Sequence, residues 1–217
     1  MKTTENFPIA REAFPYLGVL VAAGAALAVG GLWQGTVVLA LLAAYVVFFF
    51  RNPERQIPGG VEQVACPADG KVIFVGQATE KEFLQEERTK ISIFMSLFDV
   101  HINRVPVDGT VEGLKYHPGR YLAAWDDRSC EENERNTVLL RTQRGETMVL
   151  VQIAGLVARR IVCYPQKGAF VTKGQRLGLI QFGSRVDVYL PPGAKPLVHL
   201  GDRVKGGETL LAKLARG

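Results

Sequence analysis

The pair Gly183-Ser184 is the part of this sequence best suited to covalent chemistry. Glycine tolerates strained dihedral angles and leaves its carbonyl carbon unshielded, so a serine held taut beside it can attack that carbon through its hydroxyl. The resulting ester can eliminate and then hydrolyse, leaving a pyruvoyl group at Ser184. A pyruvoyl carbonyl can condense with a substrate amine and accept electrons from a departing carboxylate. The sequence therefore offers a route by which the chain makes its own cofactor.

The elements that must position this pair are strands. Residues 185–190 alternate between polar and apolar side chains, which predicts a half-buried strand with Val186 inside and Arg185 and Asp187 outside. Other short β-branched or alternating runs are separated by Gly, Pro, Asp or Asn, and they span 71–75, 91–97, 137–141 and 148–153. Strands at this spacing predict an antiparallel β domain. The charged stretch 126–136 interrupts the pattern and is expected to be a loop.

The last third of the sequence contains a repeat. Segment 171–177 (Val-Thr-Lys-Gly-Gln-Arg-Leu) matches segment 204–210 (Val-Lys-Gly-Gly-Glu-Thr-Leu), with Val, Gly and Leu in register. This signature resembles the barrel-sandwich hybrid of biotinyl and lipoyl carriers, in which glycines turn the chain between short strands. The fold class expected is mainly β, with a β sandwich or barrel-sandwich-hybrid-like catalytic domain over residues 56–217.

Residues 16–50 contain no charged side chain. Because about 20 apolar residues cross a bilayer core, this run predicts two short helices, 16–31 and 36–50, within a membrane-anchoring hairpin domain of residues 1–55. Basic residues flank the run on both sides, which places both ends at the cytoplasmic face of the cell membrane. A cleaved signal peptide and a re-entrant hairpin in one leaflet are the alternatives.

The composition limits the kinds of molecule that the protein is expected to bind. The net charge of +5 suits a protein beside anionic phospholipids, whereas no dense Lys/Arg tract with interleaved aromatics points to nucleic acid. Cys66, Cys130 and Cys163 show neither zinc-site nor disulfide spacing, so they are expected to be reduced thiols, and no metal site is predicted.

Serine attack and decarboxylation both need a group that exchanges protons near neutral pH, and the chain has three histidines. His101 lies two residues after Asp99, at a predicted strand end where functional residues often occur. His117, in Tyr-His-Pro-Gly, is the second candidate. His199 is expected to be a surface residue.

Four ordered segments resemble one family. They are 50–55 (Phe-Arg-Asn-Pro-Glu-Arg), 67–70 (Pro-Ala-Asp-Gly), 98–106 (Phe-Asp-Val-His-Ile-Asn-Arg-Val-Pro) and 182–191 (Phe-Gly-Ser-Arg-Val-Asp-Val-Tyr-Leu-Pro). Together they are similar to the short, bacterial form of phosphatidylserine decarboxylase, from about residue 14 to the C-terminus. The resemblance implies scission between Gly183 and Ser184 into a β chain (1–183) and an α chain (184–217). It also implies a covalent pyruvoyl cofactor formed from Ser184, and conversion of phosphatidylserine to phosphatidylethanolamine and carbon dioxide.

The resemblance also implies roles for individual residues. Ser184, His101 and Asp69 are the expected catalytic residues, because longer family members use an aspartate, a histidine and the processed serine as a self-cleavage triad. Those members carry a second histidine where this chain has Arg104, so either His101 serves both steps or His117 substitutes. Arg104, whose guanidinium suits a phosphodiester, and His117 are the expected substrate-binding residues. Arg159 and Arg160 are further candidates.

Two other functions are also compatible with parts of the sequence. A membrane-tethered carrier or adaptor would use the same fold, with Lys195 between the repeats as its modified residue, but the usual Met or Asp neighbours are missing. A soluble pyruvoyl-dependent amino-acid decarboxylase would not need the apolar hairpin. The sequence leaves open a homo-oligomer and a different serine-headgroup lipid as substrate.

Overall fold

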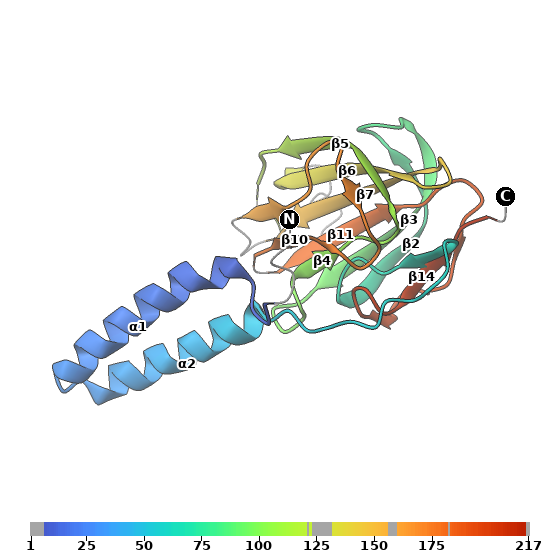
Figure 1. Ribbon diagram of the computed structural model, residues 1–217. Helices are drawn as coiled ribbons and strands as arrows, with labels where there is room; N and C mark the ends of the chain where they lie inside the picture. The colour runs from blue at the N-terminus through green and yellow to red at the C-terminus, as the bar shows by residue number, and fades with distance from the viewer. Residues whose placement is uncertain (1–6, 121, 123–131, 156–159, 182, 216–217) are drawn as a thin grey trace. The chain divides into compact units, whose positions relative to one another are not determined.

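The computed structural model divides into two compact units, residues 1–54 and 55–217. It describes residues 7–120, 122, 132–155, 160–181 and 183–215. The predicted fold class is confirmed, because an apolar helical N-terminus precedes a mainly β unit (Figure 1).

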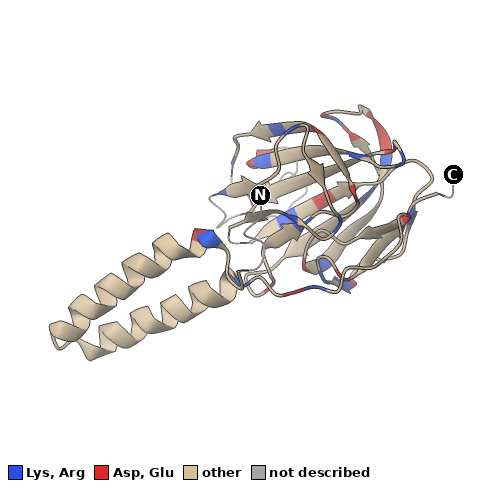
Figure 2. Cartoon of the chain, in the orientation of Figure 1, with Lys and Arg blue, Asp and Glu red and all other residues tan. Residues whose placement is uncertain are grey.

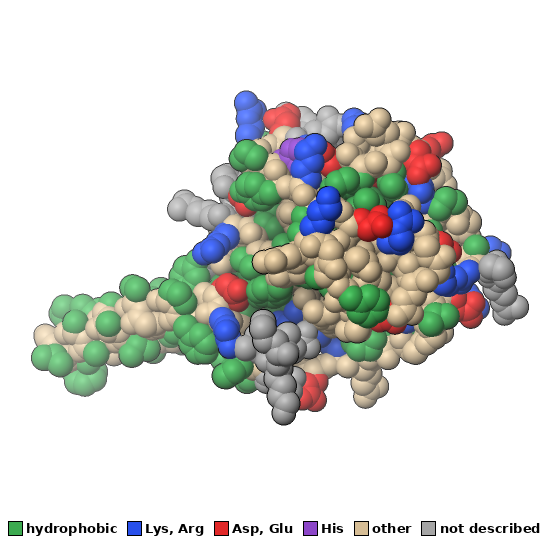
Figure 3. Space-filling model, turned by 45° about the horizontal axis from the view of Figure 1, so that its top comes forward, with side chains coloured by type: hydrophobic (Ala, Val, Ile, Leu, Met, Phe, Trp, Pro, Cys, Tyr) green, Lys and Arg blue, Asp and Glu red, His purple; other side chains and the backbone are tan. Residues whose placement is uncertain are grey.

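The first unit is a helical hairpin. A 3₁₀ turn, Arg11–Ala13, leads into α1 (Phe14–Val29), and α2 (Trp33–Phe49) returns after a short turn. Between their ends the two helices carry no charged side chain (Figure 2), and hydrophobic side chains cover the face seen in Figure 3. A helix that is apolar all round suits lipid better than water.

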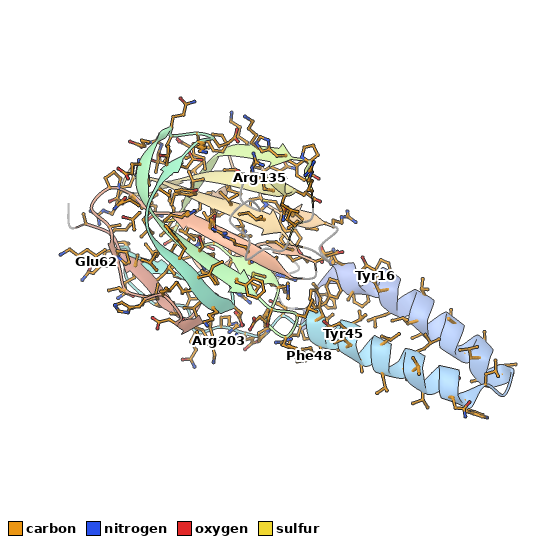
Figure 4. The ribbon with its side chains drawn as sticks, turned by 180° about the vertical axis from the view of Figure 1, so that it is seen from behind. Tyr16, Tyr45, Phe48, Glu62, Arg135 and Arg203 are labelled. Atoms are coloured by element: carbon orange, nitrogen blue, oxygen red, sulfur yellow. The ribbon has the colours of Figure 1, made fainter. Side chains whose placement is uncertain are left out.

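Backbone and aromatic contacts close the open end of the hairpin. The Ala10 N–H donates to the Phe50 carbonyl at 2.8 Å, and the rings of Tyr16 and Phe50 stack with centroids 5.9 Å apart. Tyr16, Tyr45 and Phe48 lie near this end of the two helices (Figure 4). Residues Arg11–Val29 are long and apolar enough to cross a membrane, whereas Trp33–Phe49 is shorter.

The second unit is built on a curled eight-stranded sheet in which every neighbouring pair is antiparallel. Its strand order is β13-β2-β3-β11-β7-β6-β5-β9 (Figure 1). In that order the bounds are Arg203–Val204, Gly70–Glu80, Glu86–Met95, Ser184–Tyr189, Thr147–Ala154, Arg135–Thr142, Gly109–His117 and Phe170–Val171. The predicted strands therefore all form, and the expected loop 126–136 ends inside β6; its residues 126–131 lie outside the described residues.

Two three-stranded sheets complete the unit. One has the order β1-β14-β12, with bounds Gln63–Ala65, Leu210–Lys213 and Lys195–Pro196. The other has the order β4-β10-β8, with bounds Ile102–Arg104, Arg176–Ile180 and Ile161–Cys163. The middle strand of each follows one copy of the Val-x-x-Gly-x-x-Leu repeat, and the glycines, Gly174 and Gly207, adopt φ values of 82° and 80°.

The duplication extends beyond this repeat. The order of the large sheet is palindromic about the β11–β7 pair, because β2 and β13 on one side match β5 and β9 on the other. Val204 pairs with Gly70 as Val171 pairs with Gly109, and both long strands bulge after the equivalent valine, Val72 or Val111. The segments Pro-Ala-Asp-Gly (67–70) and Pro-Val-Asp-Gly (106–109) are the second sequence repeat, which the sequence analysis missed.

The hydrophobic core lies on one face of the large sheet, where Val186, Val188 and Leu190 of β11 and its extension are fully buried. The prediction that Arg185 and Asp187 face solvent is wrong, because only 2% and 1% of their surfaces are exposed. The two charges pair with each other, with Arg185 Nε 2.6 Å from Asp187 Oδ1, and Arg185 also donates to the Ser92 hydroxyl. Mutual neutralisation lets this central strand be buried on both faces.

Candidate functional site

Ser184 is the first residue of β11 and is completely buried. It pairs with Met95 at the end of β3 and with Ala154 at the end of β7. Within the described residues, its hydroxyl donates to the Met95 thioether, with Oγ 3.6 Å from Sδ. A thioether is a weak acceptor, so this bond holds the buried hydroxyl only weakly.

Gly183 gives the chain the bend it needs before this strand. Its φ is +67°, in the left-handed region that favours glycine, and a Cβ there would meet no atom of the described residues within 4 Å, its chain neighbours left aside. The carbonyl carbon at which cleavage is predicted therefore has no side chain on its own residue to shield it. This arrangement agrees with the reason the sequence analysis gave for a glycine at this point.

His101 contacts the same peptide segment. Its Nε2 accepts the Gly183 N–H at 3.3 Å, and its Nδ1 lies 3.0 Å from the Asp99 carbonyl oxygen, to which it donates. An imidazole that donates through Nδ1 and accepts through Nε2 is neutral, with its basic lone pair directed at the glycine-serine segment. The side chain is 2% exposed, and the residue immediately precedes β4. The structure thus brings together Gly183, Ser184 and His101.

Asp69 has different partners. Its carboxylate accepts from Arg55 Nη2 at 2.8 and 2.9 Å and from the Gly206 N–H at 2.8 Å. Asp108, at the equivalent position of the second repeat, accepts the Lys173 N–H at 2.7 Å. Each aspartate therefore fastens the turn that precedes its repeat glycine. The backbone carbonyl of Asp99, rather than the Asp69 carboxylate, bonds to His101 Nδ1, and a catalytic role for Asp69 stays a prediction.

Arg104 and His117 bond to other parts of the unit. Arg104 Nη1 donates to the Gly174 carbonyl at 2.9 Å, across the turn of the first repeat. His117 Nε2 lies 2.7 Å from Glu82 Oε2, and Lys115 pairs with the same glutamate. Burial works to raise the pKa of the Glu82 carboxyl, but the bond with Lys115 and the charge of His117 outweigh it, so the net shift is downward. The substrate-binding roles of Arg104 and His117 stay predictions.

The other residues considered in the sequence are two arginines, three cysteines and Lys195. Arg159 and Cys130 lie outside the described residues, while the Arg160 carbonyl accepts the Gln181 N–H at 3.1 Å. Burial raises the pKa of the Cys66 thiol to about 12 and that of Cys163 to about 11, which keeps both protonated and unreactive at neutral pH. Lys195 is exposed and paired in β12 with Lys213 of β14, so it does not occupy the free hairpin tip that a carrier needs.

Sequence reasoning missed three buried amides. Asn136 Nδ2 donates to Gln152 Oε1 at 3.1 Å, Gln152 Nε2 donates to Asn103 Oδ1 at 2.9 Å, and Asn103 Nδ2 lies 3.6 Å from Met95 Sδ. All three are at most 6% exposed. The available signal was Gln152, a polar residue inside the otherwise apolar run 148–154. Buried amides are costly unless bonded, so a polar residue in such a strand predicts a partner.

Comparison with known proteins finds relatives that match almost the whole length of this chain. The family model for phosphatidylserine decarboxylase matches residues 42–212. A phosphatidylserine decarboxylase proenzyme of Geotalea uraniireducens is 50% identical, covering 97% of this chain and 98% of its own length. Proteins of the same name from Geobacter sulfurreducens and Paraburkholderia xenovorans are 48% and 44% identical, covering 97% and 96% of this chain and 98% and 100% of their own lengths.

The structure defines a site in a mainly β unit, in which a partly exposed glycine precedes a buried serine and a histidine contacts the glycine. The comparisons then identify the chain as a member of the phosphatidylserine decarboxylase family. The resemblance of the four sequence segments is thereby confirmed.

Asp69 and Asp108 form a matched pair for testing whether Asp69 does more than fasten a turn. We expect Asp69→Asn and Asp108→Asn each to lower the free energy of unfolding by about 1–2 kcal/mol through a weakened turn-closing hydrogen bond, and Asp69→Asn to lower it further because it also breaks the ion pair with Arg55. Following the family resemblance, we expect only Asp69→Asn to slow scission. Urea unfolding and the fraction of cleaved chain on denaturing gels measure the two effects. Equal scission rates would assign Asp69 to the fold alone.

Proposed function

We propose that this chain is a self-processing phosphatidylserine decarboxylase that works at a membrane surface with a pyruvoyl group made from Ser184. The observation that carries the proposal is the contact of His101 Nε2 with the N–H of Gly183, the residue that precedes the buried Ser184. Membership of the family supports the reaction, the conversion of phosphatidylserine to phosphatidylethanolamine and carbon dioxide.

The residues present fit the group. Ser184 is enclosed by Met95 and Ala154 in its neighbouring strands, so a carbonyl formed at residue 184 would be shielded from bulk water. Gly183 leaves its own carbonyl carbon accessible to the hydroxyl. When present, a pyruvoyl group supplies an electrophilic carbonyl that binds the substrate amine and an electron sink for the bond that loses carbon dioxide.

In self-cleavage, Ser184 Oγ bonds to the Gly183 carbonyl carbon while the Gly183–Ser184 C–N bond breaks. His101 is the proposed carrier of the hydroxyl proton to the departing nitrogen, so an ester replaces the amide with no change in composition. Removal of the Cα proton of residue 184 then breaks its Cβ–Oγ bond, and Gly183 leaves as a carboxylic acid. Water displaces ammonia from the remaining fragment to complete the new group.

In decarboxylation, His101 is the proposed donor of a proton to the substrate carbon that has lost carbon dioxide. Its Nδ1 bond to Asp99 fixes the orientation of the ring, and its burial keeps competing water away. We propose that Arg104 and His117 contribute to binding of the anionic headgroup, and that Asp69 assists self-cleavage. One histidine then serves both processing and turnover in this chain.

The proposed anchor is the hairpin of residues 1–54, and we place both of its ends at the cytoplasmic face of the cell membrane. Its charge-free helices and the basic residues that flank them support this orientation. A membrane anchor keeps the β unit at the surface where its phospholipid substrate lies.

Ser184→Ala removes the nucleophile, so we expect one uncleaved polypeptide of about 23.8 kDa without decarboxylase activity. Intact mass under denaturing conditions should show two chains for the wild type, whose summed mass is that of the precursor plus a water minus an ammonia. A summed mass equal to that of the precursor plus one water would indicate plain hydrolysis of the peptide bond. A wild-type chain that stays intact and still decarboxylates lipid would exclude the pyruvoyl mechanism.

We expect His101→Ala to abolish decarboxylation and to slow scission, because it removes the base beside Gly183. His199→Ala is the matched control, since the His199 side chain is 89% exposed. Turnover is measured as carbon dioxide release from phosphatidylserine vesicles, and scission on gels. Wild-type turnover by His101→Ala would remove His101 from the mechanism and favour His117.

Deleting residues 1–50 should release the protein from membranes and leave scission intact, because the β unit has its own core. Flotation on vesicles of anionic phospholipid measures the first effect, and intact mass the second, with the full chain as control. Recovery of the truncated chain only as an unfolded aggregate would contradict the separation of anchor and catalytic unit.

A further inference from the structure

The side-chain amides of Asn136, Gln152 and Asn103 form a hydrogen-bonded series that ends at Met95, the residue whose sulfur also contacts Ser184. Asn136 and Gln152 are directly opposite each other on β6 and β7, and Gln152 is also opposite Val186 on β11. Asn103 comes from β4 in a different sheet. The three side chains therefore join two sheets through a core that is otherwise apolar.

The hydrogen bonds between the three amides all run in one direction, from donor to acceptor. Each amide donates an N–H toward Met95, and the oxygens of Gln152 and Asn103 accept from the preceding amide. Gln152 cannot reverse without placing its oxygen against the Asn103 oxygen and its N–H₂ against the Asn136 N–H₂. The bonds thus fix which end of the Asn103 amide faces the Met95 sulfur, and that end is the donor.

The direction matters because Ser184 and Asn103 share one neighbour. Ser184 Oγ and Asn103 Nδ2 both lie 3.6 Å from Met95 Sδ. If Asn103 were reversed, an amide oxygen would stand where its N–H₂ now stands. An amide oxygen accepts a hydroxyl proton far better than a thioether does, and in a buried site that bond would hold the serine away from Gly183.

We propose that Asn103, held in this orientation by the bond from Gln152, is a positioning residue for self-cleavage. It presents a donor to the Met95 site and keeps a competing acceptor away from the Ser184 hydroxyl. This role rests on the proposed function and adds Asn103 to the processing machinery. Gln152 acts through Asn103, and the residue at position 136 matters only through the direction that it allows Gln152 to take.

Two substitutions at Asn136 separate direction from packing. Asn136→Asp, once ionised, accepts only, so Gln152 must turn its N–H₂ toward it, and Asn103 must then turn its own N–H₂ toward Gln152. Asn136→Ala removes the same donor but leaves the bond from Gln152 to Asn103 in place. The first variant therefore reverses Asn103, and the second, its matched control, does not.

Scission is followed over time in newly synthesised full-length chains, as the fraction of precursor and small chain on denaturing gels. Rates are compared from about pH 6 to 9, because a buried carboxyl that is still protonated donates as the amide does. The titratable side chains beside this position are Cys163 and Tyr116, and burial raises the pKa of both, so both stay uncharged over most of this range. Glu134, two residues upstream, interacts with Tyr116.

At the upper end of this range, we expect Asn136→Asp to cleave about tenfold more slowly than Asn136→Ala, the factor that corresponds to one hydrogen bond of about 1.4 kcal/mol. Asn136→Ala should cleave near the wild-type rate despite lower stability in urea. If either variant fails to fold, Asn103→Asp and Asn103→Leu repeat the comparison next to the serine, with the slower scission expected for Asn103→Asp.

Equal rates within the folded pair would overturn the directional amide series and leave self-cleavage standing. A wild-type chain that never cleaves would instead remove the proposed function itself. Ser184→Ala supplies the uncleaved reference on the same gel.

Discussion

The pairing of β11 with a strand on each side is the constraint on which the rest of this structure depends. β3 and β7 fix the position of Ser184 from both edges, and the residues that follow fill the core with Val186 and Val188. A break before Ser184 would remove only one covalent link. β11 would keep both neighbours, and β13 and β14 would keep their pairing with β2 and β1. The small chain would thus stay bound to the large one without a disulfide, which suits a chain proposed to be cut at the start of a central strand of its sheet.

Internal duplication shows how such a cut site fits into a stable sheet. Counting from the equivalent pairs, Gly183-Ser184 occupies the place that Gly145-Glu146 occupies in the other half. Gly145 also has a positive φ, of 86°, and there the chain makes an ordinary hairpin turn from β6 to β7. In the active half, β3 and β11 come from distant parts of the sequence, so no hairpin joins them. His101 lies in the segment that follows β3, and at the equivalent point of the other half the chain makes the short β6–β7 turn instead.

The fold was largely predictable because its signals are local. Alternation and turn residues located the long strands, and the missing charges located both helices. The sheet order was not predictable, since it depends on pairs such as Ser184 with Met95, 89 residues away in sequence. At the site, the glycine-serine pair and His101 were identified from residue type and motif, whereas Asn103 was not, because its bond to Gln152 joins different sheets. The prediction that Arg185 and Asp187 face solvent failed because an alternating pattern shows only which residues are polar. Two opposite charges can be buried when they pair with each other instead of with water.

That buried pair has a further consequence for the position of the reactive bond. Side chains alternate between the two faces of β11, so a slip of one residue would move Arg185 and Asp187 into the apolar core and expel Val186 and Val188 from it. Lys90 on β3, 4.0 Å from Asp187, adds a charge that only the observed register can satisfy. A shifted register is therefore unfavourable on both faces of β11, because it would bury charges on one face and expose valines on the other. The observed register keeps Ser184, rather than a neighbour, opposite Met95, so the charges on the far face of the sheet help to place the residue that is proposed to react.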